Sequence, residues 1–168
     1  MLLGPPLLVE RVGQQEEKGA GMTARGTLLV VEDDPAIAEV TRLCLQEEGY
    51  RVAVATTFAQ AVEALTHTRF ALVLADTLGA TAAQPDTERW ALLEQLRVLA
   101  GYTPVVIFTA HRAQDFAGFA ARGFRDLLLK PFDLDELVAT VQRSMGPTEA
   151  PPPAGVAPLR GLDESPDL

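Results

Sequence analysis

Residues 70–76 read FALVLAD, an apolar run that ends in a carboxylate. A continuous apolar run of this length is typical of a strand that is buried on both faces of a parallel sheet. Asp76 then lies where that strand leaves the sheet. Because doubly wound sheets bind ligands at the carboxyl ends of their strands, Asp76 is the first candidate functional residue.

Three other apolar runs also end in polar residues. The polar residues that follow them are Glu32 and Asp33 after residues 28–31 (LLVV), Thr109 after residues 104–108 (PVVIF), and Lys130 after residues 127–129 (LLL). Strand ends of a parallel sheet meet at one crevice, so we expect three acids, one hydroxyl and one ammonium to gather there. That set suits a divalent cation and a phosphoryl group.

Helix signals alternate with these strands. Asp34-Pro35 is a helix start, because Asp accepts hydrogen bonds from first-turn amides and Pro is tolerated at the first position. A short strand over residues 51–55 follows, and further helices are expected from Thr57, around residues 90–99, before Gly123 with Phe116 and Phe119 inside, and after Asp133. This alternation predicts an α/β fold with a parallel sheet and helices on both faces.

Two of these helices show apolar residues at helical spacing. We expect inner stripes of Ile37, Val40, Cys44 and Leu45 in the first helix, and of Leu134, Leu137, Val138 and Val141 in the last. Cys44 is the only cysteine, which excludes a disulfide framework and a cysteine zinc site.

Composition and charge limit the function classes. The chain has 168 residues, is 48% hydrophobic and carries a formal charge of -9. The negative charge argues against direct nucleic-acid binding, which uses clustered Lys and Arg. No apolar segment is long enough to cross a bilayer, and we expect no membrane insertion and a cytoplasmic location.

The ends of the chain differ in composition from its centre. Residues 1–25 predict a flexible N-terminal extension, residues 26–145 one folded domain, and residues 146–168 a disordered, Pro-rich acidic tail. We expect no DNA-binding or enzymatic output domain in so short a tail, and therefore an effect exerted through protein partners.

Four stretches together resemble a known family, the CheY-like receiver domain of two-component response regulators, in its single-domain form. They are residues 28–34 (LLVVEDD), 70–76 (FALVLAD), 105–110 (VVIFTA) and 123–132 (GFRDLLLKPF). The similarity covers roughly residues 27–145. It implies a flavodoxin-like (βα)5 fold, a doubly wound five-stranded parallel sheet with strand order 2-1-3-4-5.

The resemblance also implies roles for the strand-end residues. Asp76 would accept a phosphoryl group from a histidine kinase or phosphotransfer protein, and Glu32 and Asp33 would hold Mg²⁺ together with Asp76. Thr109 and Lys130 would contact the phosphoryl group. The protein would then be a signalling module of a phosphorelay. It would be a phosphoprotein that catalyses its own phosphorylation with Mg²⁺, and it would not be a conventional turnover enzyme.

The family pattern adds one ligand and shows two departures. A backbone carbonyl two residues after the acceptor, here that of Leu78, would also bind the metal. Residues 77–88 form a longer loop than is usual and lack the family's Asp-Gly. Leu127 stands where many members carry an aromatic residue that moves with the hydroxyl residue. A homodimer through the fourth helix, fifth strand and fifth helix is a further implied possibility.

Alternatives stay open. Residues 32–34 on their own are more typical of an acidic turn that caps a helix than of a metal site. A pseudo-receiver that binds partners without phosphate is the main functional alternative. A Mg²⁺-dependent phosphohydrolase on a related sheet is a weaker one, since Leu78 stands where many such enzymes carry a second acid.

Overall fold

The computed structural model of the chain describes residues 24–78 and 86–146. The predicted terminal segments, 1–25 and 146–168, lie almost entirely outside these ranges. The secondary-structure elements, in chain order, are β1 (Thr27–Val31), α1 (Pro35–Glu47), β2 (Arg51–Ala55), α2 (Phe58–His67), β3 (Leu72–Ala75), α3 (Asp86–Ala100), β4 (Val105–Thr109), the 3₁₀ helix η1 (Ala113–Phe116), β5 (Asp126–Leu129) and α4 (Leu134–Ser144).

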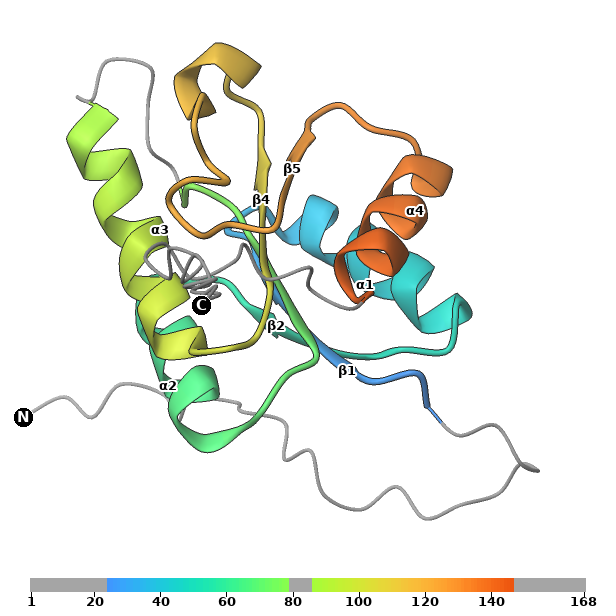
Figure 1. Cartoon of the computed structure of the whole chain (residues 1–168). Helices are drawn as coiled ribbons and strands as arrows, with labels where there is room; N and C mark the ends of the chain where they lie inside the picture. Colours follow the sequence, from blue (N-terminus) through green and yellow to red (C-terminus); the bar gives the residue numbers. More distant parts are fainter. Residues whose placement is uncertain (1–23, 79–85, 147–168) are drawn as a thin grey trace, which may run out of the picture.

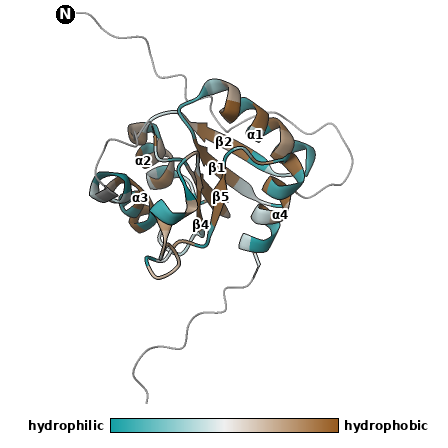
Figure 2. Cartoon of the chain, turned by 90° about the horizontal axis from the view of Figure 1, so that it is seen from above, coloured by the Kyte–Doolittle hydropathy of each residue, from teal (hydrophilic) through white to brown (hydrophobic). Residues whose placement is uncertain are grey.

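The five strands form one parallel sheet in the order β2-β1-β3-β4-β5. Helices α1 and α4 cover one face of the sheet and α2 and α3 cover the other (Figure 1). The predicted fold class and strand order are therefore confirmed, with four α-helices among the described residues. Seen from above, the strands form an apolar layer between the two helix layers (Figure 2).

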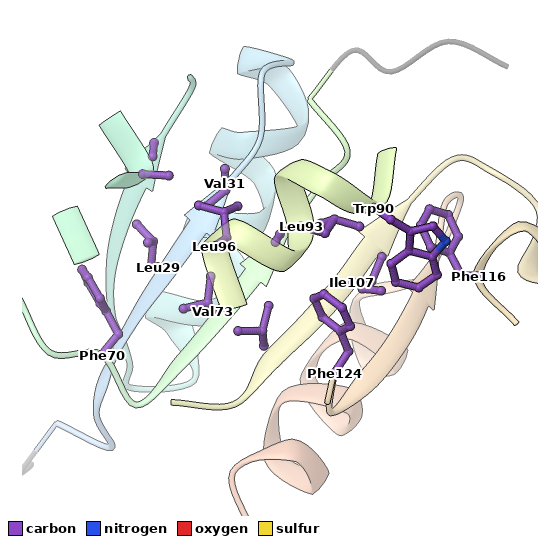
Figure 3. Close-up of a cluster of buried hydrophobic side chains, with 14 residues drawn as sticks. Leu29, Val31, Phe70, Val73, Trp90, Leu93, Leu96, Ile107, Phe116 and Phe124 are labelled. Carbon is purple, nitrogen blue, oxygen red and sulfur yellow. The ribbon is translucent and has the colours of Figure 1, made fainter. Parts of the chain in front are cut away.

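Alternate residues of each strand face opposite helix layers, as the period of two requires. One buried cluster lies under α2 and α3 and includes Leu29, Val31, Val73, Ile107, Phe116, Trp90, Leu93 and Leu96 (Figure 3). The other lies under α1 and α4 and includes Leu28, Val30, Leu72, Leu74, Val106, Phe108, Leu128, Leu137 and Val141. Strands buried on both faces explain the continuous apolar runs.

The helix starts that the sequence indicates are formed. The Asp34 carboxylate accepts hydrogen bonds from the N–H groups of Ala36 and Ile37 at 2.8 and 3.1 Å. The Asp133 carboxylate accepts one from the N–H of Glu136 at 2.8 Å. These caps satisfy amides that the first turn of a helix leaves without a partner.

The predicted inner stripes were wrong at two positions. Val40 is 54% exposed and Leu134 is 48% exposed, although Cys44 and Leu137 are buried as expected. In α1 the buried face runs through Ala38, Thr41, Cys44 and Leu45, so Val40 lies on the edge that faces solvent. Hydrophobicity alone did not reveal this, because a buried Thr and an exposed Val reverse the usual pattern.

The helix predicted between the fourth and fifth strands is also wrong. The segment 111–122 contains only η1, followed by turns that are closed mostly by hydrogen bonds between residues three apart. Gly118 has φ +80°, a left-handed conformation that an α-helix cannot contain. Phe116 is nevertheless buried, and Gly123, with φ +89°, lies just after the last turn.

Helix α3 begins at residue 86, before the expected start near Trp90. The last three residues of the predicted loop 77–88 are therefore helical, and residues 79–85 lie outside the described ranges. Within the described ranges, no helix is both long enough and apolar enough to span a bilayer.

Helix α3 provides a direct test of the packing. Leu96→Ala should lower the free energy of unfolding by about 2–5 kcal/mol, because Leu96 is fully buried against the sheet. Val98→Ala is the matched control on the same helix: Val98 is 67% exposed, and its truncation should change stability by less than about 0.5 kcal/mol. Urea unfolding measures both. Equal losses would contradict the observed orientation of α3.

Candidate phosphoryl and metal site

The predicted site residues lie at one edge of the sheet, where four strands end. Asp76 directly follows β3, and its N–H donates to the Val31 carbonyl of β1 at 2.9 Å. Lys130 directly follows β5, and its N–H donates to the Thr109 carbonyl of β4 at 2.7 Å. The sheet hydrogen bonds thus continue one residue past the strands and fix the backbone of both residues.

Three carboxylates gather at this edge. One oxygen each from Glu32, Asp33 and Asp76 lies within 4.8 Å of the other two. Glu32 and Asp76 are buried, whereas Asp33 is exposed. In the part of the chain that the structure describes, this is the one such grouping of three possible metal-binding side chains.

The Lys130 ammonium lies between two of these acids. Its Nζ donates a hydrogen bond to Glu32 Oε2 and another to Asp76 Oδ1, the latter at 3.3 Å. The side chain is mostly buried and its Nζ lies 4.3 Å from the centre of the Phe108 ring. Lys130 therefore links the ends of β1, β3 and β5 and compensates part of the negative charge of the cluster.

Burial raises the pKa of Glu32 above its ordinary value of 4.5. The hydrogen bond from Lys130 and the one from the Asp34 N–H to Oε1, at 2.9 Å, oppose this rise, and the nearby charge of Asp76 adds to it. Desolvation dominates because the carboxyl group is almost completely removed from water.

The Asp76 carboxylate has donors on both oxygens. Lys130 bonds to Oδ1, and the main-chain N–H of Leu78 donates to Oδ2 at 3.0 Å. Leu78 has φ +49°, the left-handed region that non-glycine residues seldom adopt. The main chain of Leu78, whose carbonyl the family resemblance implies as a metal ligand, is thereby held against the Asp76 carboxylate.

Thr109 is the last residue of β4 and is fully buried. Its Oγ1 accepts a hydrogen bond from the main-chain N–H of His111 at 3.1 Å. A hydroxyl has one proton to donate besides its two lone pairs, so the Thr109 proton stays available for a further acceptor. The contact with His111 was not predicted, because a main-chain donor has no signal in the sequence.

Two other buried polar residues were not predicted. Thr77, which follows Asp76, and Arg89, in the first turns of α3, are each only 4% exposed. The pKa of Asp115 in η1 is lowered mainly by its hydrogen bond with Arg112, and the charge of Arg89 contributes to the same direction.

Comparisons with known proteins agree with this geometry. Residues 28–142 match the family model described as the response regulator receiver domain. The chain is 39% identical over 115 residues to the alginate biosynthesis transcriptional regulatory protein AlgB of Pseudomonas putida, covering 67% of this chain and 24% of that protein. The chain thus spans about a quarter of the length of that curated relative.

Two solved structures have similar folds. A CheY-like receiver domain protein from Methanospirillum hungatei has a TM-score of 0.60 and 25% identity, covering 71% of this chain and 92% of that one. The receiver domain of a sensor histidine kinase from Pseudomonas aeruginosa has a TM-score of 0.57 and 26% identity, covering 73% of this chain and 98% of that one. Its description states that a magnesium ion is coordinated in the active-site cleft.

The charge balance of the site predicts the effect of removing the Lys130 ammonium. Lys130→Met in EDTA should lower the free energy of unfolding by about 2 kcal/mol or more, because buried Glu32 and Asp76 lose their shared partner. The control Arg143→Met breaks an exposed ion pair with Asp126 and should cost less than about 1 kcal/mol.

The Lys130→Met penalty should also depend on pH. Because the pKa of Glu32 is raised in the folded protein, the folded state holds its proton more tightly than the unfolded chain does. Its contribution to stability therefore falls as pH rises above 4.5, and losing Lys130 raises the pKa further. Denaturant titrations should show a larger penalty near neutral pH than near pH 4.5. A pH-independent penalty would contradict the assigned pairing.

Proposed function

Since the chain belongs to the response regulator receiver domain family, we propose that Asp76 accepts a phosphoryl group from a phosphohistidine donor. The observation that carries the proposal is the position of Lys130, whose ammonium touches both Glu32 and Asp76 at the carboxyl edge of the sheet. A phosphoryl group that arrives at this cluster of acids is itself an anion. The Lys130 ammonium, which already lies between two of the acids, can compensate its negative charge.

In the proposed reaction an Asp76 carboxylate oxygen attacks the phosphorus. The bond from phosphorus to the donor histidine nitrogen breaks, and its electron pair returns to the imidazole. Negative charge remains on the phosphoryl oxygens, where Lys130 offers its ammonium and Thr109 its hydroxyl proton. Positioning and electrostatic stabilisation supply most of the catalysis of such transfers, and they need no other covalent step.

We further propose Glu32, Asp33 and Asp76 as ligands of Mg²⁺, with the Leu78 carbonyl as a fourth. The donor set fits this ion, because Mg²⁺ takes a few carboxylate oxygens and keeps several waters. Exposed Asp33 leaves the open side of the cluster accessible to such waters. When bound, Mg²⁺ neutralises charge on the carboxylates and on the phosphoryl oxygens.

The donor surface that we propose adjoins this site. A hollow of about 540 Å³ lies between the first turns of α1 and the segment from Lys130 to Leu134. Its lining is apolar apart from Thr41 and Lys130, and exposed Val40 and Leu134 form part of its rim. A partner domain seated on these side chains would hold its phosphohistidine next to Asp76.

The protein then acts as a signalling module that modifies itself once per signal, without turnover of a separate substrate. Its effect passes to protein partners, and the net charge of the whole chain, -9, disfavours direct contact with nucleic acid. A cytoplasmic location suits a partner of a histidine kinase. A dimer through the segment 111–122, β5 and α4 is a further proposal.

Acetyl phosphate tests the chemistry without a partner. With Mg²⁺, intact-mass spectrometry of the full chain should show one added phosphoryl group, because acceptor, metal ligands and cation are all assembled. Asp76→Asn or EDTA should abolish the adduct, and Asp126→Asn, at a surface acid, should leave it unchanged. A chain that stays unmodified with acetyl phosphate and with a panel of phosphorylated kinases would favour the pseudo-receiver alternative.

The donor surface has a separate test. Val40→Glu should slow transfer from a phosphorylated kinase or phosphotransfer domain at least about tenfold, because burying an unpaired charge in a contact costs more than 1.4 kcal/mol. Its modification by acetyl phosphate should not change. Val98→Glu, at an exposed position on the opposite helix layer, is the matched control. Equal transfer rates for both variants would exclude this surface.

A further inference from the structure

Two residues of the segment 111–122, Phe116 and Arg122, contact Trp90 of α3. Near the start of the segment, Phe116 packs edge-on against Trp90, with ring centres 5.3 Å apart. Near its end, the Arg122 guanidinium lies 4.3 Å from the centre of the Trp90 ring and pairs with Glu94. Trp90 and Phe116 lie side by side at one end of the buried cluster (Figure 3).

The same segment begins at the phosphoryl site. The His111 N–H donates to Thr109 Oγ1, and the His111 ring lies 6.3 Å from the Phe116 ring. Aromatic pairs at such centre distances attract one another and respond to changes in orientation. A continuous series of contacts therefore runs from the Thr109 hydroxyl through His111 and Phe116 to Trp90.

The secondary structure of this segment is weak enough for it to move. A single 3₁₀ turn and a few i→i+3 bonds hold residues 113–123, and this bonding is poorer than that of an α-helix. Regions with little regular hydrogen bonding are drawn from the less stable part of a fold. By contrast, the two elements that this segment contacts, β4 and α3, contain fully buried residues, among them Ile107 of β4 and Leu93 of α3.

A change at Thr109 acts on this segment directly. If the Thr109 side chain rotates about its Cα–Cβ bond to bring the hydroxyl to a phosphoryl oxygen, Oγ1, which accepts from the His111 N–H, moves with it. The His111 backbone must follow or lose its hydrogen bond. Half-buried Leu127 of β5 packs against the same buried cluster as Trp90 and Phe116. Leu127 has no aromatic ring that could reorient when Thr109 moves.

Resting on the proposed function of Asp76, we propose that phosphorylation changes the packing of Trp90 through Thr109, His111 and Phe116. The output surface is then the face of α3 and the segment 111–122, where Arg122 and Glu94 are exposed beside Trp90. A partner that reads this state contacts α3, in addition to or in place of α4.

Trp90 is the only tryptophan of the chain, so its signals report this step without labelling. The test adds Mg²⁺ and beryllofluoride, a mimic of the phosphoryl group, to the full chain. We expect a change in tryptophan emission and a shift of the Trp90 indole N–H resonance. Mg²⁺ alone should give a smaller change. In Phe116→Leu most of both changes should be lost.

Phe124→Leu is the matched control. The Phe124 ring also lies against Trp90, with ring centres 5.7 Å apart, but it follows the segment 111–122 and is not one of the contacts that run from Thr109 through His111 and Phe116. This variant should respond like the wild type. If Phe116→Leu does not fold, Arg122→Gln removes the second contact with Trp90 at a more exposed position, and it should also reduce the response.

Acetyl phosphate adducts separate the two possible failures. A chain that takes one phosphoryl group while both Trp90 signals stay constant would overturn the packing change and leave the function intact. A full response in Phe116→Leu would overturn it as well. A chain that takes no phosphoryl group would instead overturn the proposed function.

Discussion

The site depends on one buried cation between two acids. The Lys130 ammonium joins Glu32 and Asp76, which arrive from the ends of β1 and β3. Without it, two buried carboxylates and a third close by would repel one another at the edge of a low-dielectric sheet. The strands place these groups together because the sheet hydrogen bonds continue one residue past β3 and β5, from Asp76 to Val31 and from Lys130 to Thr109. The residues that end the strands are therefore the same residues that form the site.

This arrangement explains why the chain tolerates unfavourable features at one place. Burial raises the pKa of Glu32, Leu78 adopts a left-handed backbone, and both oxygens of the Asp76 carboxylate are engaged before any ligand arrives. Strained or desolvated groups of this kind gather at functional sites. A phosphoryl group at Asp76 would add about one negative charge to the site and would take over the Lys130 ammonium from Oδ1.

The sequence predicted the strands, and the gathering of the polar residues that follow them, because both rest on strong local signals. Apolar runs that end in Asp76, Thr109 and Lys130 indicate buried parallel strands, and parallel strands leave no choice about where their ends meet. Helix faces were less predictable: Val40 and Leu134 are exposed, since the tilt of a helix on the sheet is set by packing along its whole length. The missing helix before β5 follows from Gly118, whose positive φ depends on tertiary context. The His111 contact with Thr109 involves a main-chain donor and had no signal at all.

The central claim is that Asp76, and no other acid of the cluster, carries the phosphoryl group. Borohydride reduces an acyl phosphate to the alcohol, which marks the modified carboxylate permanently. After phosphorylation with Mg²⁺ and reduction, peptide mapping should find homoserine at residue 76. The two other acids that could accept the phosphoryl group instead are Glu32, which bonds to Lys130, and Asp33, which is exposed. Reduction at residue 32 or 33 with residue 76 unchanged would contradict the account.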